Sequence, residues 1–227
     1  MSGGNNRRKI DTVVFDFDGT LVDTNDAVLE SWQYAAREIL GCEFPYDKLK
    51  ATLGEPIMRT VAALFPGQDA GAVVEAYRAF HHEHFEDMIK IFDGVHDMLE
   101  ALRSDGYKLG VVTNRLRYTT EIGLDQFGLA KYFGAVVTVG EAPKDKPEPE
   151  HIWFTLDKLG SSPDRAVLVG DSQNDIIGGH RAGLVSVRVN WAVATDEGFG
   201  DKAAEPDFSI DTPAGLLAVI AELNGRA

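Results

Sequence analysis

The sequence predicts an α/β protein in which a mostly parallel sheet carries helices on both faces and is interrupted near its start by an all-helical insertion. From residue 92 onward, strand-like and helix-like segments alternate with short connections, which is typical of a parallel sheet. Val13 to Phe15 form an apolar run without polar alternation, as expected of a strand buried on both faces. Residues 24–91 show helical patterns only. We therefore expect a core of residues 1–23 and 92–227 and a helical cap of residues 24–91.

The expected cap contains amphipathic segments separated by glycine and proline. Helices are expected at 27–40, 46–53, 56–64 and 70–88. Apolar spacing in the last of these predicts one buried stripe with a single histidine on it, formed by Val73, Tyr77, Phe80, His84 and Met88. His81, His82 and His84 also cluster here. No Cys or Asp joins them at ligand spacing, so a zinc site is the weaker interpretation.

The core segments follow in alternating order. Helices are expected at 95–104, 116–127, 149–159, 174–182 and 214–223, and strands at 108–113, 135–139, 166–169 and 184–189. Ligands of such sheets gather at the carboxyl ends of the strands. The residues that follow each strand are therefore the candidates for chemistry.

Composition and charge exclude several classes of partner. The 227-residue chain has 36 acidic and 22 basic residues, and its net charge of −14 opposes binding to nucleic acid and to anionic membranes. No apolar run approaches the roughly 20 residues that a membrane-spanning helix needs. Cys42, the single cysteine, forms no internal disulfide. We expect a cytoplasmic protein, and the sequence does not indicate its oligomeric state.

Two carboxylates end the first strand. Asp16 and Asp18 are two residues apart, so their side chains can point the same way from the end of a strand. Gly19 permits a turn there, and we expect its backbone amide to be free to bind an anion. This stretch predicts an acidic site at the carboxyl edge of the sheet.

Further polar residues fall at corresponding places along the chain. Thr113 and Asn114 follow the second core strand, and Lys146 precedes a helix. Asp171 and Asp175 follow the strand at 166–169. Together with Asp16 and Asp18 they would form a carboxylate cluster that repels itself unless a cation is present, and oxygen ligands favour Mg²⁺. Lys146 and Thr113, through its hydroxyl and backbone amide, suit binding of a phosphoryl group.

These motifs resemble those of the haloacid dehalogenase-like (HAD) hydrolases. The matching stretches are Asp16-Phe17-Asp18-Gly19-Thr20, Thr113-Asn114, Lys146-Pro147 and Gly170-Asp171-Ser172 with Asp175. The helical insertion after the first motif is similar to the subgroup with a small α-helical cap, and closer similarity points to phosphoglycolate phosphatases and PpaX-type pyrophosphatases. The resemblance implies a Rossmann-like, HAD-like core and a Mg²⁺-dependent phosphatase acting on a small phosphorylated metabolite.

The resemblance also implies a role for each motif residue. Asp16 would attack phosphorus to give an aspartyl-phosphate, and Asp18 would serve as general acid and base. Thr113 and Lys146 would bind the phosphoryl oxygens. The implied magnesium ligands are Asp16, the backbone carbonyl of Asp18, and Asp171, with Asp175 holding the metal's water shell.

The cap would select the substrate. Glu55 lies where relatives carry a loop that faces the substrate, and its negative charge is unfavourable for a second anionic group. Arg59, Arg78 and Arg115 are the candidates for compensating positive charge, with the alternative that each is an ordinary surface side chain. Gly19 and Asn114 complete the expected substrate-binding residues.

Two alternative functions remain open. A sugar-phosphate phosphomutase, similar to β-phosphoglucomutase, would share every catalytic residue and differ in returning the phosphoryl group to its substrate. A non-enzymatic phospho-acceptor that resembles a response-regulator receiver is a remote alternative, because such a domain has about half this length.

Overall fold

The fold is centred on a six-stranded parallel sheet with the strand order β5-β4-β1-β6-β7-β8. The computed structural model describes residues 9–192 and 205–225. The strands are β1 (Thr12–Phe15), β4 (Lys108–Val112), β5 (Ala135–Val137), β6 (Ala166–Gly170), β7 (Val185–Val189) and β8 (Phe208–Ile210). The predicted α/β class with a mostly parallel sheet is confirmed.

The first strand lies at the centre of this sheet because every side chain in it is buried. β1 pairs with β4 on one side and with β6 on the other, in a register that sets Phe15 beside Val111 and Val169. The three strands therefore end at the same level. The residues that directly follow these three strands therefore lie together at one edge of the sheet.

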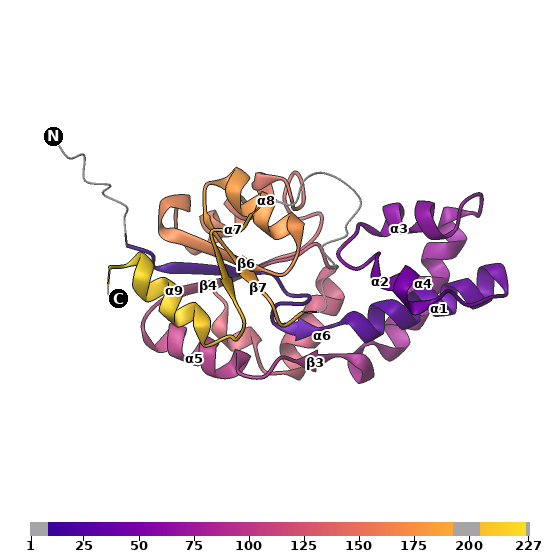
Figure 1. The fold of residues 1–227 in the computed structure, drawn as a ribbon, viewed down its shortest axis with the longest axis horizontal. Coiled ribbons are helices and arrows are strands. Elements are labelled where there is room, and N and C mark those ends of the chain that lie inside the picture. Colours follow the sequence, from indigo (N-terminus) through magenta and orange to yellow (C-terminus); the bar gives the residue numbers. More distant parts are fainter. Residues whose placement is uncertain (1–8, 193–204, 226–227) are drawn as a thin grey trace.

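Helices cover both faces of the sheet (Figure 1). The helices of one face are α5 (Val95–Ser104), α6 (Arg117–Gln126) and α9 (Gly215–Leu223), and those of the other are α7 (Pro149–Leu159) and α8 (Gln173–Ala182). Leu99 and Leu216 belong to the apolar cluster on the first face, and Ile152 and Leu156 to the cluster on the second. Two short 3₁₀ helices, Ala130–Tyr132 and Pro163–Arg165, precede β5 and β6.

The helical insertion extends from one end of the sheet (Figure 1). It consists of α1 (Asn25–Leu40), α2 (Tyr46–Lys50), α3 (Ile57–Leu64) and α4 (Ala70–Met88). These helices share an apolar cluster of their own, in which the tilted rings of Trp32 and Tyr77 pack with centroids 4.2 Å apart. A ribbon of β2 (Val22–Asp23) and antiparallel β3 (Lys90–Ile91) joins the two ends of the insertion. Among the described residues, no helix is both long and apolar enough to span a membrane.

The predicted buried stripe of α4 is wrong in its second half. The buried residues of this helix are Val73, His81 and Phe85, and the histidine that faces inward is His81. His84 is 40% exposed. Both sets of residues recur at helical spacing, and the packing of α4 against α1 selects the one that contains His81.

Candidate active site

The acidic stretch after β1 continues the pairing of the central strand. The Asp16 amide donates to the carbonyl of Val169 in β6 at 2.8 Å. The Phe17 amide donates to Oδ1 of Asp16 at 2.7 Å. The backbone therefore fixes both the position of Asp16 and the orientation of its carboxylate.

Gly19 turns the chain directly beside Asp171. Its φ of 69° lies in the left-handed region, and a Cβ at this position would lie 2.1 Å from Oδ2 of Asp171. The expectation that the Gly19 amide is free to bind an anion is wrong, because this amide donates to the carbonyl of Val22 at 2.9 Å. Glycine is required here because the turn passes so close to a carboxylate.

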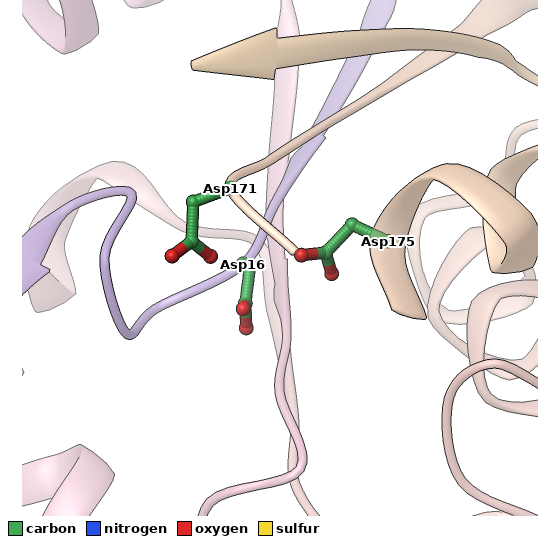
Figure 2. Close-up of side chains that lie close together, drawn as sticks. All are labelled: Asp16, Asp171 and Asp175. Atoms are coloured by element: carbon green, nitrogen blue, oxygen red, sulfur yellow. The ribbon is translucent and has the colours of Figure 1, made fainter. Parts of the chain in front are cut away.

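Three buried or partly buried carboxylates meet at the carboxyl ends of β1 and β6 (Figure 2). One oxygen from each of Asp16, Asp171 and Asp175 lies within 4.8 Å of the others. Asp175 belongs to the first turn of α8, where its Oδ2 accepts hydrogen bonds from the amide and the hydroxyl of Ser172 at 3.1 and 2.6 Å. This capping box aims Asp175 at the other two carboxylates.

Lys146 lies between two of these carboxylates. Its Nζ is 2.8 Å from Oδ1 of Asp16 and 2.6 Å from Oδ1 of Asp175, and the side chain is buried. Burial opposes the charge of Lys146, but Asp16 and Asp175 outweigh it and raise the pKa of this amine. The lysine is therefore a fixed positive charge.

One ammonium does not neutralise three carboxylates. Burial, followed by repulsion from Asp175, raises the pKa of Asp16 to about 7. Burial and the neighbouring carboxylates also raise the pKa of Asp171 well above its usual range. Clustered carboxylate oxygens with this excess of negative charge fit a hard divalent cation such as Mg²⁺.

The residues that follow β4 hold the Lys146 loop in place. Asn114 exchanges two hydrogen bonds with the Lys146 backbone, donating from Nδ2 to the carbonyl at 2.8 Å and accepting at Oδ1 from the amide at 3.1 Å. Thr113 is buried, and its backbone amide donates to the carbonyl of Val137. The expectation that this amide binds a phosphoryl group is therefore wrong. Its hydroxyl accepts from the Arg115 amide at 3.1 Å, which leaves the hydroxyl proton available for donation.

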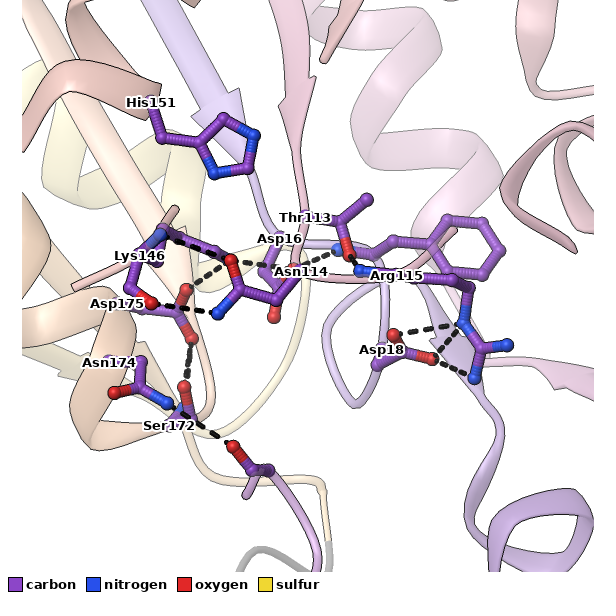
Figure 3. A network of polar contacts seen from close by, with 12 residues as sticks. Asp16, Asp18, Thr113, Asn114, Arg115, Lys146, His151, Ser172, Asn174 and Asp175 are labelled. Carbon is purple, nitrogen blue, oxygen red and sulfur yellow. Dashed lines mark hydrogen bonds and ion pairs between the residues drawn. The ribbon is translucent and has the colours of Figure 1, made fainter. Parts of the chain in front are cut away.

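Asp18 pairs with Arg115, apart from the contacts that join Asp16 and Asp175 to Lys146 (Figure 3). Arg115 Nε donates to both carboxylate oxygens at 2.8 and 3.0 Å, and Nη2 lies 2.8 Å from Oδ1. The hydroxyl of Thr24, at the start of the insertion, donates to Oδ1 at 2.5 Å. Sequence reasoning missed Thr24, and it placed Arg115 among the substrate contacts rather than beside Asp18.

The loop between α2 and α3 lies against the turn that carries Asp171. Asn174 Nδ2 donates to the carbonyl of Gly54 at 3.2 Å (Figure 3). The neighbouring Glu55 side chain is only 11% exposed, and its Oε2 lies 3.3 Å from Nη1 of Arg59. The insertion therefore brings an acidic group, partly compensated by an arginine, close to the candidate site.

Arg78 lies elsewhere on the insertion. It is exposed on α4 and lines an open groove of about 630 Å³ together with Met58, Val74 and His82. None of the clustered carboxylates lines this groove. The structure does not bring Arg78 to Asp16.

Comparison with known proteins places this geometry in a family. A family model described as haloacid dehalogenase-like hydrolase matches residues 13–189. The chain is 33% identical over 211 residues to pyrophosphatase PpaX of Anoxybacillus flavithermus, covering 93% of this chain and 97% of that protein. It is 32% identical over 220 residues to pyrophosphatase PpaX of Bacillus mycoides, covering 96% and 100%.

Solved structures show the same fold. A haloacid dehalogenase-like family hydrolase from Streptococcus pneumoniae superposes with a TM-score of 0.80 at 24% identity, covering 92% of this chain and 98% of that one. A protein from Haemophilus somnus predicted to be a phosphoglycolate phosphatase superposes with a TM-score of 0.79 at 24% identity, covering 93% and 98%. The match over most of the sequence and the site at the carboxyl ends of β1, β4 and β6 lead to one conclusion: this chain is an enzyme of the haloacid dehalogenase-like hydrolase family.

Proposed function

We propose that the protein is a Mg²⁺-dependent phosphatase that hydrolyses a small phosphorylated metabolite through a phosphoryl group carried on Asp16. The observation that carries this proposal is the pairing of Asp16 with Lys146 at the end of β1, next to Asp171 and Asp175. A carboxylate nucleophile, a fixed ammonium and an acidic metal site are the parts that phosphoryl transfer requires. The names of the PpaX relatives support a phosphoryl substrate.

In the first half-reaction, an oxygen of Asp16 attacks phosphorus and the bond to the leaving oxygen breaks. The Phe17 amide and Lys146 Nζ both contact Oδ1 of Asp16, so the carboxylate is already oriented before the substrate arrives. Lys146 and the Thr113 hydroxyl would bind phosphoryl oxygens and stabilise their charge.

Asp18 would move the protons. It donates a proton to the leaving oxygen in the first half-reaction and takes one from the attacking water in the second, when the bond between phosphorus and Asp16 breaks. Its side chain is 35% exposed, so it can reach a bound substrate and water. Arg115 and Thr24 hold it apart from the nucleophile.

The residues that would hold the metal are Asp16, Asp171, Asp175 and the backbone carbonyl of Asp18. A bound Mg²⁺ would offset the repulsion among the carboxylates and stabilise negative charge on the phosphoryl group. The Gly19 turn leaves room for Asp171 in this group, since any larger residue would collide with it.

Residues 24–91 would act as a cap that excludes water and selects the substrate, over a core formed by the remainder of the chain. The contact of Gly54 with Asn174 supports this role because it brings the α2–α3 loop to the site. Pyrophosphate and phosphoglycolate are the candidate substrates suggested by the relatives' names. The lone cysteine is compatible with the cytoplasm, where we propose that the enzyme acts.

The test is phosphate release from pyrophosphate, phosphoglycolate and sugar phosphates, with Mg²⁺ and with EDTA. We expect release from at least one of them in Mg²⁺ and none in EDTA or from Asp16→Asn. Analysis of the organic product separates hydrolysis from the phosphomutase alternative, which would give an isomeric sugar phosphate. Undiminished release by Asp16→Asn would contradict the proposed nucleophile.

A further inference from the structure

All three guanidinium nitrogens of Arg115 make contacts, some with the core and one with the insertion. Nε and Nη2 contact the Asp18 carboxylate on the core side. Nη1 lies 2.9 Å from Nε2 of His81, on α4 of the insertion. The guanidinium carbon also lies 4.6 Å from the ring centroid of Phe85, one turn further along the same helix.

The hydrogen bonds around His81 define which nitrogen carries the proton. The hydroxyl of Ser31 donates to the carbonyl of Ala27 at 2.5 Å, so its oxygen is the acceptor in its 3.1 Å contact with Nδ1 of His81. Nδ1 therefore carries the proton, and Nε2 is left to accept from Arg115. Burial, together with the positive charge of Arg115, lowers the pKa of His81 to about 4, which agrees with a neutral ring.

We propose that His81 is a positioning residue for the general acid and base: by accepting from Nη1 of Arg115, it turns the guanidinium so that Nε and Nη2 face Asp18. This inference rests on the proposed function of Asp18. His81 and Arg115 are 34 residues apart in sequence and come from the insertion and the core, so the alignment exists only when α4 lies against the core. His81 thereby orients Asp18 through Arg115 and does not itself touch the reacting atoms.

The geometry explains why a histidine stands at this position. An arginine has many rotamers, and a fork that holds a carboxylate in one orientation requires that these rotamers be restricted. Phe85 packs against one face of the guanidinium and fixes its plane, and the hydrogen bond to His81 fixes how the guanidinium is turned within this plane. Tyr77 and Phe85 hold the His81 ring itself, with centroids 5.3 and 4.9 Å away.

The test compares substrates that differ in their need for a general acid. An alkyl phosphate needs protonation of its leaving oxygen, whereas an aryl phosphate with an acidic phenol leaves without it. In His81→Phe the ring stacking is kept and the acceptor is lost. We expect kcat/KM to fall by about 10-fold or more for the alkyl phosphate, a fraction of the 10²–10⁴ of general acid catalysis, and by less than about 3-fold for the aryl phosphate.

Two further variants separate positioning from a general loss of structure. His81→Gln restores an acceptor at a similar reach and should recover most of the alkyl phosphate activity. His84→Phe makes the same change at a histidine on α4 whose ring packs against Phe80, and should leave both activities unchanged. Should His81→Phe fail to fold, Ser31→Ala, which removes the acceptor for Nδ1–H, should show the same leaving-group dependence in weaker form.

Coupling to Arg115 gives the final criterion. If His81 acts through Arg115, His81→Phe should cost little when Arg115→Met is already present. Equal losses on the two substrates, additive losses in the double variant, or wild-type kinetics in His81→Phe would each overturn the inference. A wild-type protein that hydrolyses neither phosphate would instead contradict the proposed function, so the two failures are distinguishable.

Discussion

Nζ of Lys146 lies 2.8 Å from Oδ1 of Asp16, and this buried ion pair joins the end of β1 to the loop before α7. The same Nζ contacts Asp175, so one ammonium supports two carboxylates from different motifs. Its loss should affect stability as well as chemistry, because the carboxylates would remain buried without a cation.

Lys146→Met should therefore abolish turnover and lower the free energy of unfolding of the metal-free protein at pH 7, by about 3 kcal/mol if it behaves as other broken buried pairs do. Chemical denaturation with and without Mg²⁺ checks this, and Mg²⁺ should restore part of the loss. Lys144→Met is a suitable control, since Lys144 pairs with Glu150 at an exposed position. Equal stability of Lys146→Met and wild type would show that the carboxylates do not depend on this cation.

The carboxylate cluster predicts a pH-dependent response to magnesium. The pKa of Asp16 is raised from its ordinary value of 3.8 to about 7. Between these pH values the metal-free folded state holds a proton that the unfolded state has lost, so the free energy of unfolding falls as pH rises from 3.8 to about 7. Mg²⁺ competes with this proton. The gain in Tm on adding Mg²⁺ should be larger at pH 8 than at pH 5.5, and Asp171→Asn should reduce the gain at pH 8. A gain that is the same at both pH values would contradict the assignment.

Burial of His81 makes the free energy of unfolding rise with pH, the opposite of the effect of Asp16. Its folded-state pKa of about 4 is below the ordinary value of 6.5, so the unfolded state binds more protons between these values and stability falls as pH decreases from 6.5 to 4. Lowering the pH from 7 to 5 should therefore cost about 2 kcal/mol of unfolding free energy through His81. The difference in unfolding free energy between wild type and His81→Gln should change by roughly that amount over this interval. A difference that is constant with pH would show that His81 titrates normally.

Removing the charge of Glu55 and removing that of Arg59 should change substrate preference in opposite directions. The Glu55 carboxylate is largely buried next to the site and should repel the second anionic end of phosphoglycolate or pyrophosphate. Glu55→Gln should raise kcat/KM for these substrates by about 3-fold relative to one with an uncharged tail, which is the scale of a partly screened charge pair. Arg59→Gln should lower the same ratio because it removes the positive charge that lies 3.3 Å from Oε2 of Glu55. Unchanged ratios in both variants would exclude this loop from charge selection.

The sequence allowed prediction of the central strands, though not of β8, and of the motif residues that directly follow them, because both depend on local patterns. The apolar run before Asp16 and the strands that precede Thr113 and Asp171 are visible in short windows, and parallel strands end at one edge. The two-residue strands β2 and β3 are too short to leave such a pattern.

Contacts between distant segments were not predictable from such windows. Asp18 and Arg115 are 97 residues apart, and they meet because they follow β1 and β4, which pair side by side in the sheet. The inward face of α4 was misassigned as well. Val73 and Tyr77 fit both possible stripes, and only tertiary packing selects His81 over His84.

The most direct test of the proposed mechanism is to trap the phosphoryl group on Asp16. Asp18→Asn should slow overall turnover by at least about 100-fold, and it should slow hydrolysis of the intermediate because no base activates the water. An aryl phosphate with an acidic phenol forms the intermediate without a general acid, so acid quenching of this variant with that substrate and Mg²⁺, followed by peptide mapping by mass spectrometry, should find one phosphoryl group on Asp16. A phosphoryl group on another residue, or substrate turnover at the wild-type rate with no phosphorylated peptide, would contradict the account.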